Sequence, residues 1–233
     1  MFKWLKKTII IFLIKCYPDR YLKWKKIGSH SLSKDKTFLH LYSILIKNSL
    51  AIQRIEEQYN LWSIAKSVAT LKGNMAEVGV YTGGSTKILC EAKGETHLHL
   101  FDTFSGLPDT DTKKDGSFQK GDFADCSIET VKKLLSHYPN VHFHKGFFPS
   151  TTKPLNNKAI KFKFVHLDVD LYRSTHDALE WFYPRMVHGG IIITHDYGDL
   201  TVPGVKQAFD KFFSNKPEVV IPIWYSQAII VKS

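Results

Sequence analysis

Short apolar runs alternate with amphipathic stretches along most of the chain. Seven of the runs have the length and the branched or aromatic composition of strands, and turn-forming residues bound them. Stretches with helical spacing separate most of these runs. Because strands and helices alternate, the pattern predicts an α/β fold with a doubly wound, mostly parallel sheet. The predicted strands are Met75–Val80, His97–Phe101, Val141–His144, Phe162–Leu167, Gly190–Thr194, Val219–Pro222 and Gln227–Val231, and the predicted helices are Ser85–Ala92, Ser127–Tyr138, Ser174–Tyr183 and Val205–Phe213.

The chain before the first predicted strand differs from the rest in pattern and in charge. Residues 38–71 have helical periodicity and no strand-like run, which predicts a helical part ahead of the sheet. The segment up to Lys26 holds eight basic residues and one acid, so it carries +7 of the formal net charge of +10. We therefore predict a basic amphipathic leader over residues 1–37 and a single α/β domain, with this helical N-terminal part, over residues 38–233.

The apolar run inside the leader, Thr8–Ile14, is too short to span a bilayer, and no small-residue cleavage site follows it. Two roles stay open for the leader. Either it lies on an anionic membrane surface, or it packs as a terminal helix on the domain or on the partner subunit of a homodimer. The three cysteines lack disulfide, metal or redox spacing. Their pattern predicts a cytoplasmic protein, with or without contact to the inner face of the membrane.

Acidic residues and a histidine follow two of the predicted strands. Asp168 and Asp170 come directly after the fourth strand, and His195 and Asp196 follow the fifth. Since open α/β sheets bind their ligands at the carboxyl ends of strands, these side chains predict a metal site or an acid–base site. An acid after a strand is also a common helix N-cap, so each residue alone has a structural alternative.

A glycine-rich turn follows the first predicted strand and opens a helix. Gly79 and Gly83 let the backbone approach a ligand closely, and the helix N-terminus supplies free amide donors. The spacing is not that of a dinucleotide-binding loop, and Glu77 before the first glycine favours a cationic amino-acid headgroup, such as that of S-adenosylmethionine, over phosphate. Asp102 ends the next strand, where an acid accepts hydrogen bonds from ribose hydroxyls. A helix cap is the alternative for Asp102 alone, but together the two features predict a nucleoside site.

Six segments, in order from about Arg54 onwards, resemble the macrocin O-methyltransferase (TylF-type) family. The most specific of them are Phe-Asp-Thr-Phe-Ser-Gly-Leu-Pro at 101–108 and Leu-Asp-Val-Asp-Leu-Tyr at 167–172. The resemblance implies a class I methyltransferase with a Rossmann-like sheet. Such an enzyme moves a methyl group from S-adenosylmethionine to a hydroxyl, typically on a sugar, with the help of a divalent cation. The other segments are Glu77–Ser85, Lys120–Phe123, Val141–Pro149, and Asp196-Tyr197 followed by Pro203-Gly204.

The resemblance also implies roles for single residues. Asp168 and Asp196 would be metal ligands, and Asp170 the base that takes the acceptor proton, or alternatively a residue that orients Asp168. His195 stands where the family has an acid, so it is a third metal ligand, a base or a packing residue. We expect Mg²⁺, with Mn²⁺ as the alternative that an imidazole favours. The predicted cofactor residues are Glu77, Gly79, Tyr81, Thr82, Gly83, Ser85, Thr86, Asp102, Thr103, Phe104, Gly121, Asp122, Phe123 and Asp168.

The segment 103–122 is polar and has no apolar period. Long loops at the carboxyl ends of strands select substrates and often order on binding. The resemblance makes part of this segment a lid, and a solvated loop without a role is the alternative.

Other classes of function fit the sequence less well. The positive charge sits in the leader and the body has no arginine-rich stripe, which argues against a nucleic-acid partner. A methyltransferase for catechol-like molecules, a nucleic-acid methyltransferase and a binding module without activity are the alternatives. The sequence thus predicts an O-methyltransferase with a small-molecule or glycan acceptor.

Overall fold

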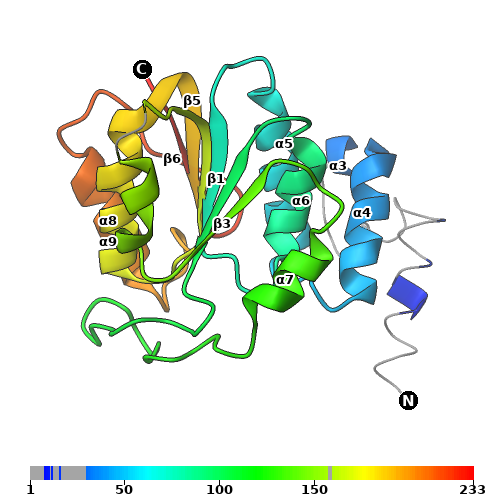
Figure 1. Cartoon of the computed structure of the whole chain (residues 1–233), viewed down its shortest axis with the longest axis horizontal. Helices are drawn as coiled ribbons and strands as arrows, with labels where there is room; N and C mark the ends of the chain where they lie inside the picture. The colour runs from blue at the N-terminus through cyan, green and yellow to red at the C-terminus, as the bar shows by residue number, and fades with distance from the viewer. Residues whose placement is uncertain (1–7, 11, 13–15, 17–29, 157–158) are drawn as a thin grey trace.

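The computed structural model describes residues 8–10, 12, 16, 30–156 and 159–233. Within them, seven strands form one sheet in the order β3-β2-β1-β4-β5-β7-β6 (Figure 1). Neighbouring strands are parallel from β3 to β5, whereas β7 is antiparallel to both β5 and β6. The predicted doubly wound, mostly parallel sheet is confirmed. The strands are β1 (Asn74–Val78), β2 (Leu98–Asp102), β3 (Val141–Lys145), β4 (Phe162–Leu167), β5 (Met186–Thr194), β6 (Ile221–Pro222) and β7 (Ala228–Val231).

Helices cover both faces of the sheet (Figure 1). One layer contains the helices of the N-terminal part together with α6 and α7, and the other contains α8 and α9. The α-helices are α3 (His30–Lys34), α4 (Lys36–Lys47), α5 (Ile55–Ser67), α6 (Gly84–Ala92), α7 (Ile128–Leu134), α8 (Tyr172–Phe182) and α9 (Pro203–Phe213), and the short 3₁₀ helices are η1 (Ser150–Leu155) and η2 (Tyr183–Arg185).

Side chains of the central strands alternate between these two layers, as the two-residue period of a strand requires. In β1, Met75 packs in the layer of α3–α7 and Ala76 in the layer of α8 and α9. In β4, Phe164 packs in the layer of α3–α7 and Val165 in the layer of α8 and α9. Every residue of this strand is buried. A strand that is buried on both faces needs a nearly continuous apolar run. That run is what made β4 recognisable in the sequence.

The strand β1 lies where the strand order reverses, with β2 on one side of it and β4 on the other. Open α/β sheets bind ligands beside the carboxyl ends of strands at such a point. The pairing aligns Val78 of β1 with Phe101 of β2 and Leu167 of β4, and Leu167 in turn with Thr194 of β5. The residues that follow these four strands therefore meet at one edge of the sheet.

Some predicted bounds differ from the structure. The strand β5 begins at Met186 rather than Gly190, because the glycine pair that reads as a turn forms an irregularity inside the strand. The register between β4 and β5 shifts there, and Gly189 has a φ of 77°. The predicted strand Val219–Pro222 shortens to the two residues of β6, and α7 is shorter than predicted.

Most of the predicted leader, residues 1–37, lies outside the described residues, so its membrane and dimer roles stay predictions. The packed core includes residues before position 38, since Leu32 of α3 is buried in the same apolar cluster as Phe38. No helix within the described parts of the chain has the length and apolarity that crossing a membrane requires. The three cysteines are free.

A buried carboxylate beside β7 gives the fold a pH-dependent contact. Glu218 accepts hydrogen bonds from Lys232 Nζ at 2.7 Å and from the Tyr183 hydroxyl at 2.7 Å. Burial raises the pKa of Glu218, but these donors outweigh it and lower the pKa from 4.5 to about 2. Because the folded-state pKa is lowered, the stabilisation is present above pH 4.5 and is lost as the pH falls through about 2.

We expect Glu218→Gln to lower the free energy of unfolding at pH 7 by about 1–3 kcal/mol, because an amide accepts these hydrogen bonds less strongly than a carboxylate. The difference from the wild type should shrink as the pH approaches 2. Urea denaturation of both proteins across this range measures it. An equal difference at all pH values would contradict the assigned pKa.

Candidate active site

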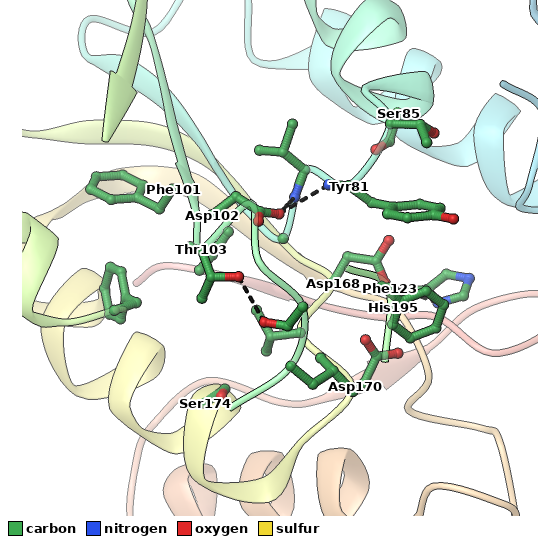
Figure 2. A pocket seen from close by; sticks show the side chains of 18 of the residues that line it. Tyr81, Ser85, Phe101, Asp102, Thr103, Phe123, Asp168, Asp170, Ser174 and His195 are labelled. Carbon is green, nitrogen blue, oxygen red and sulfur yellow. Dashed lines mark hydrogen bonds and ion pairs between the residues drawn. The ribbon is translucent and has the colours of Figure 1, made fainter. Parts of the chain in front are cut away.

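A cavity of about 330 Å³ opens at the carboxyl edge of the sheet (Figure 2). Residues that follow β1, β2, β4 and β5 line it, together with the connection between α4 and α5 and the loop after β2. The sequence-predicted residues that the structure brings together in this lining are Gly79, Tyr81, Thr82, Ser85, Asp102, Thr103, Phe123, Asp168, Asp170, His195 and Asp196.

The carboxylate of Asp102 shapes the glycine-rich turn. Its Oδ2 accepts hydrogen bonds from the backbone amides of Val80 at 2.6 Å and Tyr81 at 2.9 Å (Figure 2). Its Oδ1 accepts from the amide of Phe104 at 2.6 Å. A carboxylate oxygen can accept two hydrogen bonds, so Oδ1, which accepts only the amide of Phe104, keeps capacity for a ligand in the cavity that Asp102 lines.

Gly79 is the position where this turn needs a glycine. Its φ is 89°, and a Cβ there would lie 1.7 Å from the backbone oxygen of Asp168. The absence of a side chain lets the end of β1 approach the end of β4. The two halves of the cavity wall, the glycine turn and the acidic residues, are therefore in direct contact.

Glu77 lies behind the turn rather than in the cavity. Its side chain is fully buried, with Oε1 2.9 Å from His166 Nδ1 and Oε2 accepting a hydrogen bond from the Thr86 hydroxyl. A direct contact between Glu77 and a cofactor headgroup therefore does not fit this position, and the carboxylate instead ties β1 to β4 and to α6. The other predicted cofactor residues outside the cavity lining are Gly83, Thr86, Phe104, Gly121 and Asp122.

The predicted metal ligands Asp168, His195 and Asp196 lie together. One donor atom of each falls within 4.8 Å of the others. His195 Nδ1 is 2.7 Å from Asp196 Oδ1 and 3.2 Å from Asp168 Oδ1. Gln53 Nε2 donates to the other oxygen of Asp168 at 2.8 Å. Two carboxylates and one imidazole nitrogen at this spacing are a donor set for Mg²⁺ or Mn²⁺, so the residues present fit a divalent cation.

The charges of this cluster shift one another's protonation. Burial lowers the pKa of His195, but the nearby carboxylates, led by Asp168, outweigh burial and hold the pKa well above its ordinary value. Burial raises the pKa of Asp168, and the opposite effect of His195 brings it down to about 2. Glu57 behaves similarly, because hydrogen bonding and charge from His195 outweigh burial and lower its pKa to about 2.

Asp170 has the opposite protonation behaviour. Burial, then the charges of Asp168 and Asp196, raise the pKa of Asp170 well above its ordinary value, and a hydrogen bond to Asp196 adds to the effect. Asp170 and Asp196 both have left-handed backbone conformations, with φ of 60° and 59°. Residues other than glycine are uncommon there, and such conformations concentrate at functional sites. Asp170 lines the cavity, as a group that exchanges protons with a ligand must.

Gln53 and Glu57, which contact the acidic cluster, were not predicted from the sequence, and neither were the polar lining residues Gln58 and Ser174. Gln53 and Glu57 come from the connection before α5 and from its first turn, far from the strand ends in sequence. An acid at the third position of a helix usually caps the helix, and Glu57 does accept from the backbone amide of Arg54. Nothing local in the sequence distinguishes such a cap from an acid that also faces a distant site.

The loop 103–122, part of which is predicted to be a lid, is hydrogen-bonded to the rest of the domain. Asp115, which is 2% exposed, accepts hydrogen bonds from the backbone amide of Tyr172 at 2.8 Å and from that of Asp111 at 2.8 Å. The amide of Tyr172 opens α8, which has no other side-chain cap. Asp115 thus links the loop to the helix that follows Asp170.

We expect Asp115→Ala to lower the free energy of unfolding by about 1–3 kcal/mol, because it leaves two backbone amides without their acceptor. Chemical denaturation at neutral pH measures the loss. Asp109→Asn in the same loop is the control, since Asp109 is exposed and pairs only at the surface with Lys120. If both variants lower the free energy of unfolding by a similar small amount, the hydrogen bonds of Asp115 do not stabilise the loop.

The comparisons with known proteins match a methyltransferase family and individual O-methyltransferases. The family model described as macrocin-O-methyltransferase (TylF) matches residues 53–225. A demethyldecarbamoylnovobiocin O-methyltransferase of Streptomyces niveus is 28% identical over 160 residues, which are 60% of this chain and 58% of that protein. An 8-demethyl-8-(2,3-dimethoxy-alpha-L-rhamnosyl)-tetracenomycin-C 4'-O-methyltransferase of Streptomyces olivaceus is 32% identical over 143 residues, 54% of this chain and 53% of that protein. The chain thus spans little more than half the length of these relatives.

A solved O-methyltransferase structure shares the fold of this chain. The solved structure of the O-methyltransferase NovP superposes with a TM-score of 0.63 at 24% identity, over 77% of this chain and 80% of that one. This likeness supports the predicted Rossmann-like methyltransferase fold. The family match includes the acidic cluster and the glycine turn, and it covers well over half of the sequence. The chain therefore belongs to the macrocin-O-methyltransferase (TylF) family.

Proposed function

We propose that this protein is an S-adenosylmethionine-dependent O-methyltransferase that uses a divalent cation and acts on a hydroxyl of a sugar or of a glycosylated metabolite. The observation that carries the proposal is one cavity with Asp102 on one wall and Asp168, His195 and Asp196 on the other. Family membership supports the reaction type. The Streptomyces olivaceus relative acts, by its name, on a rhamnosyl compound, which supports a sugar acceptor.

Asp102 and the glycine turn form the proposed cofactor side of the cavity. S-adenosylmethionine supplies the methyl group as a sulfonium, which needs alignment rather than activation. Asp102 is held by three backbone amides and faces the cavity, so the remaining lone pair of its Oδ1 is available to accept a hydrogen bond from a ribose hydroxyl. Gly79 lets the turn pack directly against the backbone of Asp168, which holds the cofactor side next to the acidic residues.

Asp168, His195 and Asp196 form the proposed metal side. A divalent cation held there supplies a Lewis acid, which lowers the pKa of an acceptor hydroxyl. The protein positions the donors through hydrogen bonds, as when Gln53 fixes the carboxylate of Asp168. The buried position of Asp196 limits competition from water.

Asp170 is the proposed base. A neutral hydroxyl attacks a methyl group poorly, so a carboxylate that takes its proton speeds the transfer. Burial and the neighbouring carboxylates raise the pKa of Asp170, which makes it a stronger proton acceptor than an exposed aspartate. Its left-handed backbone directs the side chain from the end of β4 to the cavity lining.

Calorimetric titration with S-adenosylhomocysteine, the product form of the cofactor, tests the nucleoside site. We expect the wild type to bind it and Asp102→Ala to lose at least about tenfold in affinity, since a hydrogen bond to a charged carboxylate, worth about 1.5–3 kcal/mol, would be lost. Glu129→Gln is the control, because Glu129 lies in the first turn of α7 outside the cavity lining. Absence of binding by the wild type would contradict the methyltransferase proposal.

An acceptor screen tests the substrate class. Transfer of a labelled methyl group is measured with nucleotide sugars, free glycosides and catechols, in the presence of EDTA, Mg²⁺ or Mn²⁺. Turnover of sugars that EDTA abolishes is the expected result. If only catechols are methylated, the proposed sugar acceptor is wrong. If EDTA leaves turnover unchanged, the reaction does not use a divalent cation.

A further inference from the structure

The imidazole of His195 lies between carboxylates on opposite sides. Its Nδ1 faces Asp168 and Asp196, at 3.2 Å and 2.7 Å from their nearest oxygens. Its Nε2 lies 3.5 Å from Glu57 Oε1, which belongs to α5. Only 16% of the His195 side chain and 5% of the Glu57 side chain are exposed, so water competes little for this contact. Both ring nitrogens are therefore directed at carboxylates of the protein.

Glu57 is itself held in place from two directions. Its Oε2 accepts a hydrogen bond from the backbone amide of Arg54 at 3.0 Å, which caps α5. Its Oε1 accepts from the hydroxyl of Ser226 at 2.6 Å and from the Ser226 amide at 3.3 Å. Capping of α5 uses only one oxygen. The other oxygen, which faces His195, has no role in the cap.

We infer that Glu57 is a positioning residue that holds Nε2 of His195 and so presents Nδ1 to the pocket as a metal ligand beside Asp168 and Asp196. The inference rests on the proposed function and extends it. Histidines that bind metals generally give their second nitrogen to a carboxylate, which fixes the ring, and loss of that partner typically costs 10–100-fold in metal affinity. With Nδ1 directed at Asp168 and Asp196 and Nε2 buried and directed at Glu57, neither ring nitrogen is placed to take the acceptor proton, so Asp170 is the base and His195 is not.

Gln53 provides a parallel contact from the same part of the chain. It binds one oxygen of Asp168 and leaves the other toward His195. The segment from Gln53 to Glu57 therefore orients two of the three donors. A site whose donors are oriented in advance loses less freedom when it binds an ion.

Titration with Mn²⁺, followed by the electron paramagnetic resonance signal of the free ion, tests the inference. The proteins are the wild type, Glu57→Gln, His195→Ala and the double variant. Glu56→Gln is the matched control, because Glu56 carries the same charge in the same turn of α5. We expect Glu57→Gln to weaken Mn²⁺ binding by about 10–100-fold and Glu56→Gln to leave it unchanged. In the His195→Ala background, Glu57→Gln should have no further effect.

Two results would overturn the inference while the proposed function stands. In one, Glu57→Gln binds Mn²⁺ as tightly as Glu56→Gln does. In the other, Glu57→Gln weakens binding equally with and without the imidazole, which would show an effect that does not act through His195. Glutamine keeps an acceptor oxygen for Arg54 and Ser226, so this variant is expected to fold.

Titration of the same samples with S-adenosylhomocysteine separates the inference from the function on which it rests. Unchanged affinity in the Glu57 variant is expected, because Glu57 is not part of the cavity lining. If the wild type binds S-adenosylhomocysteine but does not bind Mn²⁺, the proposed metal site is wrong, and so is the role of His195 as a metal ligand. A wild type that binds neither would contradict the methyltransferase proposal itself.

Discussion

Replacement of Asp170 by Asn is expected to lower kcat by about 10²–10⁴-fold, the usual contribution of a general base, and to leave the affinity for S-adenosylhomocysteine unchanged. Asn has nearly the same shape as Asp but takes up no proton. It also tolerates the left-handed backbone conformation that Asp170 adopts. The fall in kcat should therefore reflect the loss of proton transfer rather than a change of fold. Steady-state kinetics with the acceptor found in the screen measure it.

The matched control is Asp177→Asn in α8. Asp177 lies on the helix that follows Asp170 but outside the cavity lining, so its loss should leave kcat near that of the wild type. Near-normal turnover by Asp170→Asn would remove the base assignment. A large loss of S-adenosylhomocysteine affinity in that variant would instead mean that Asp170 orders the site.

Glu77→Ala is expected to lower the free energy of unfolding by about 2–6 kcal/mol, because it leaves two buried hydrogen-bond donors without their acceptor, at about 1–3 kcal/mol each. Glu77 and His166 are both fully buried, so the imidazole is not exposed to solvent in the wild type. The hydroxyl of Thr86 in α6 also loses its acceptor. Because α6 opens at the glycine turn, cofactor affinity should fall together with stability. Urea denaturation and calorimetric titration of S-adenosylhomocysteine measure the two effects.

Glu77→Gln separates the two contributions, since it keeps one acceptor and removes the charge. We expect it to lose less stability than Glu77→Ala. Glu95→Ala at the exposed end of the same β1–α6–β2 unit is the control and should change stability by less than about 0.5 kcal/mol. If Glu77→Ala were as stable as this control, the buried pair would contribute nothing.

The sheet and the acidic cluster were predictable because both depend on local pattern. Central strands such as β4 are buried throughout and mostly apolar, and parallel strands end at one edge, so residues after β4 and β5 must meet there. Asp168, His195 and Asp196 therefore lie together as predicted. The same reasoning placed Asp102 correctly, at the end of β2 in the cavity.

The position of Glu77 was not predictable in this way. The alternation of side chains along a strand predicts the face of the sheet on which each side chain lies. It does not predict which residues that side chain contacts. Glu77 pairs in register with His166 of β4, and this partner occurs 89 residues later in the chain. The sequence therefore predicted that Glu77, just before the glycine turn, contacts the cofactor. In the structure Glu77 contacts the buried imidazole of His166 instead. Gln53 and Glu57 were missed for the same reason, because their partners are distant in sequence.

The contact between Glu57 and Ser226 joins positions 169 residues apart. In folding, such a contact closes one of the longest loops that the chain allows, and long-range closures of this kind slow folding. During synthesis, the acidic cluster therefore gains its full surroundings only after the segment around β7 has emerged and docked. In a growing chain, Glu57 and Ser226 therefore stay apart until nearly the whole domain has been made.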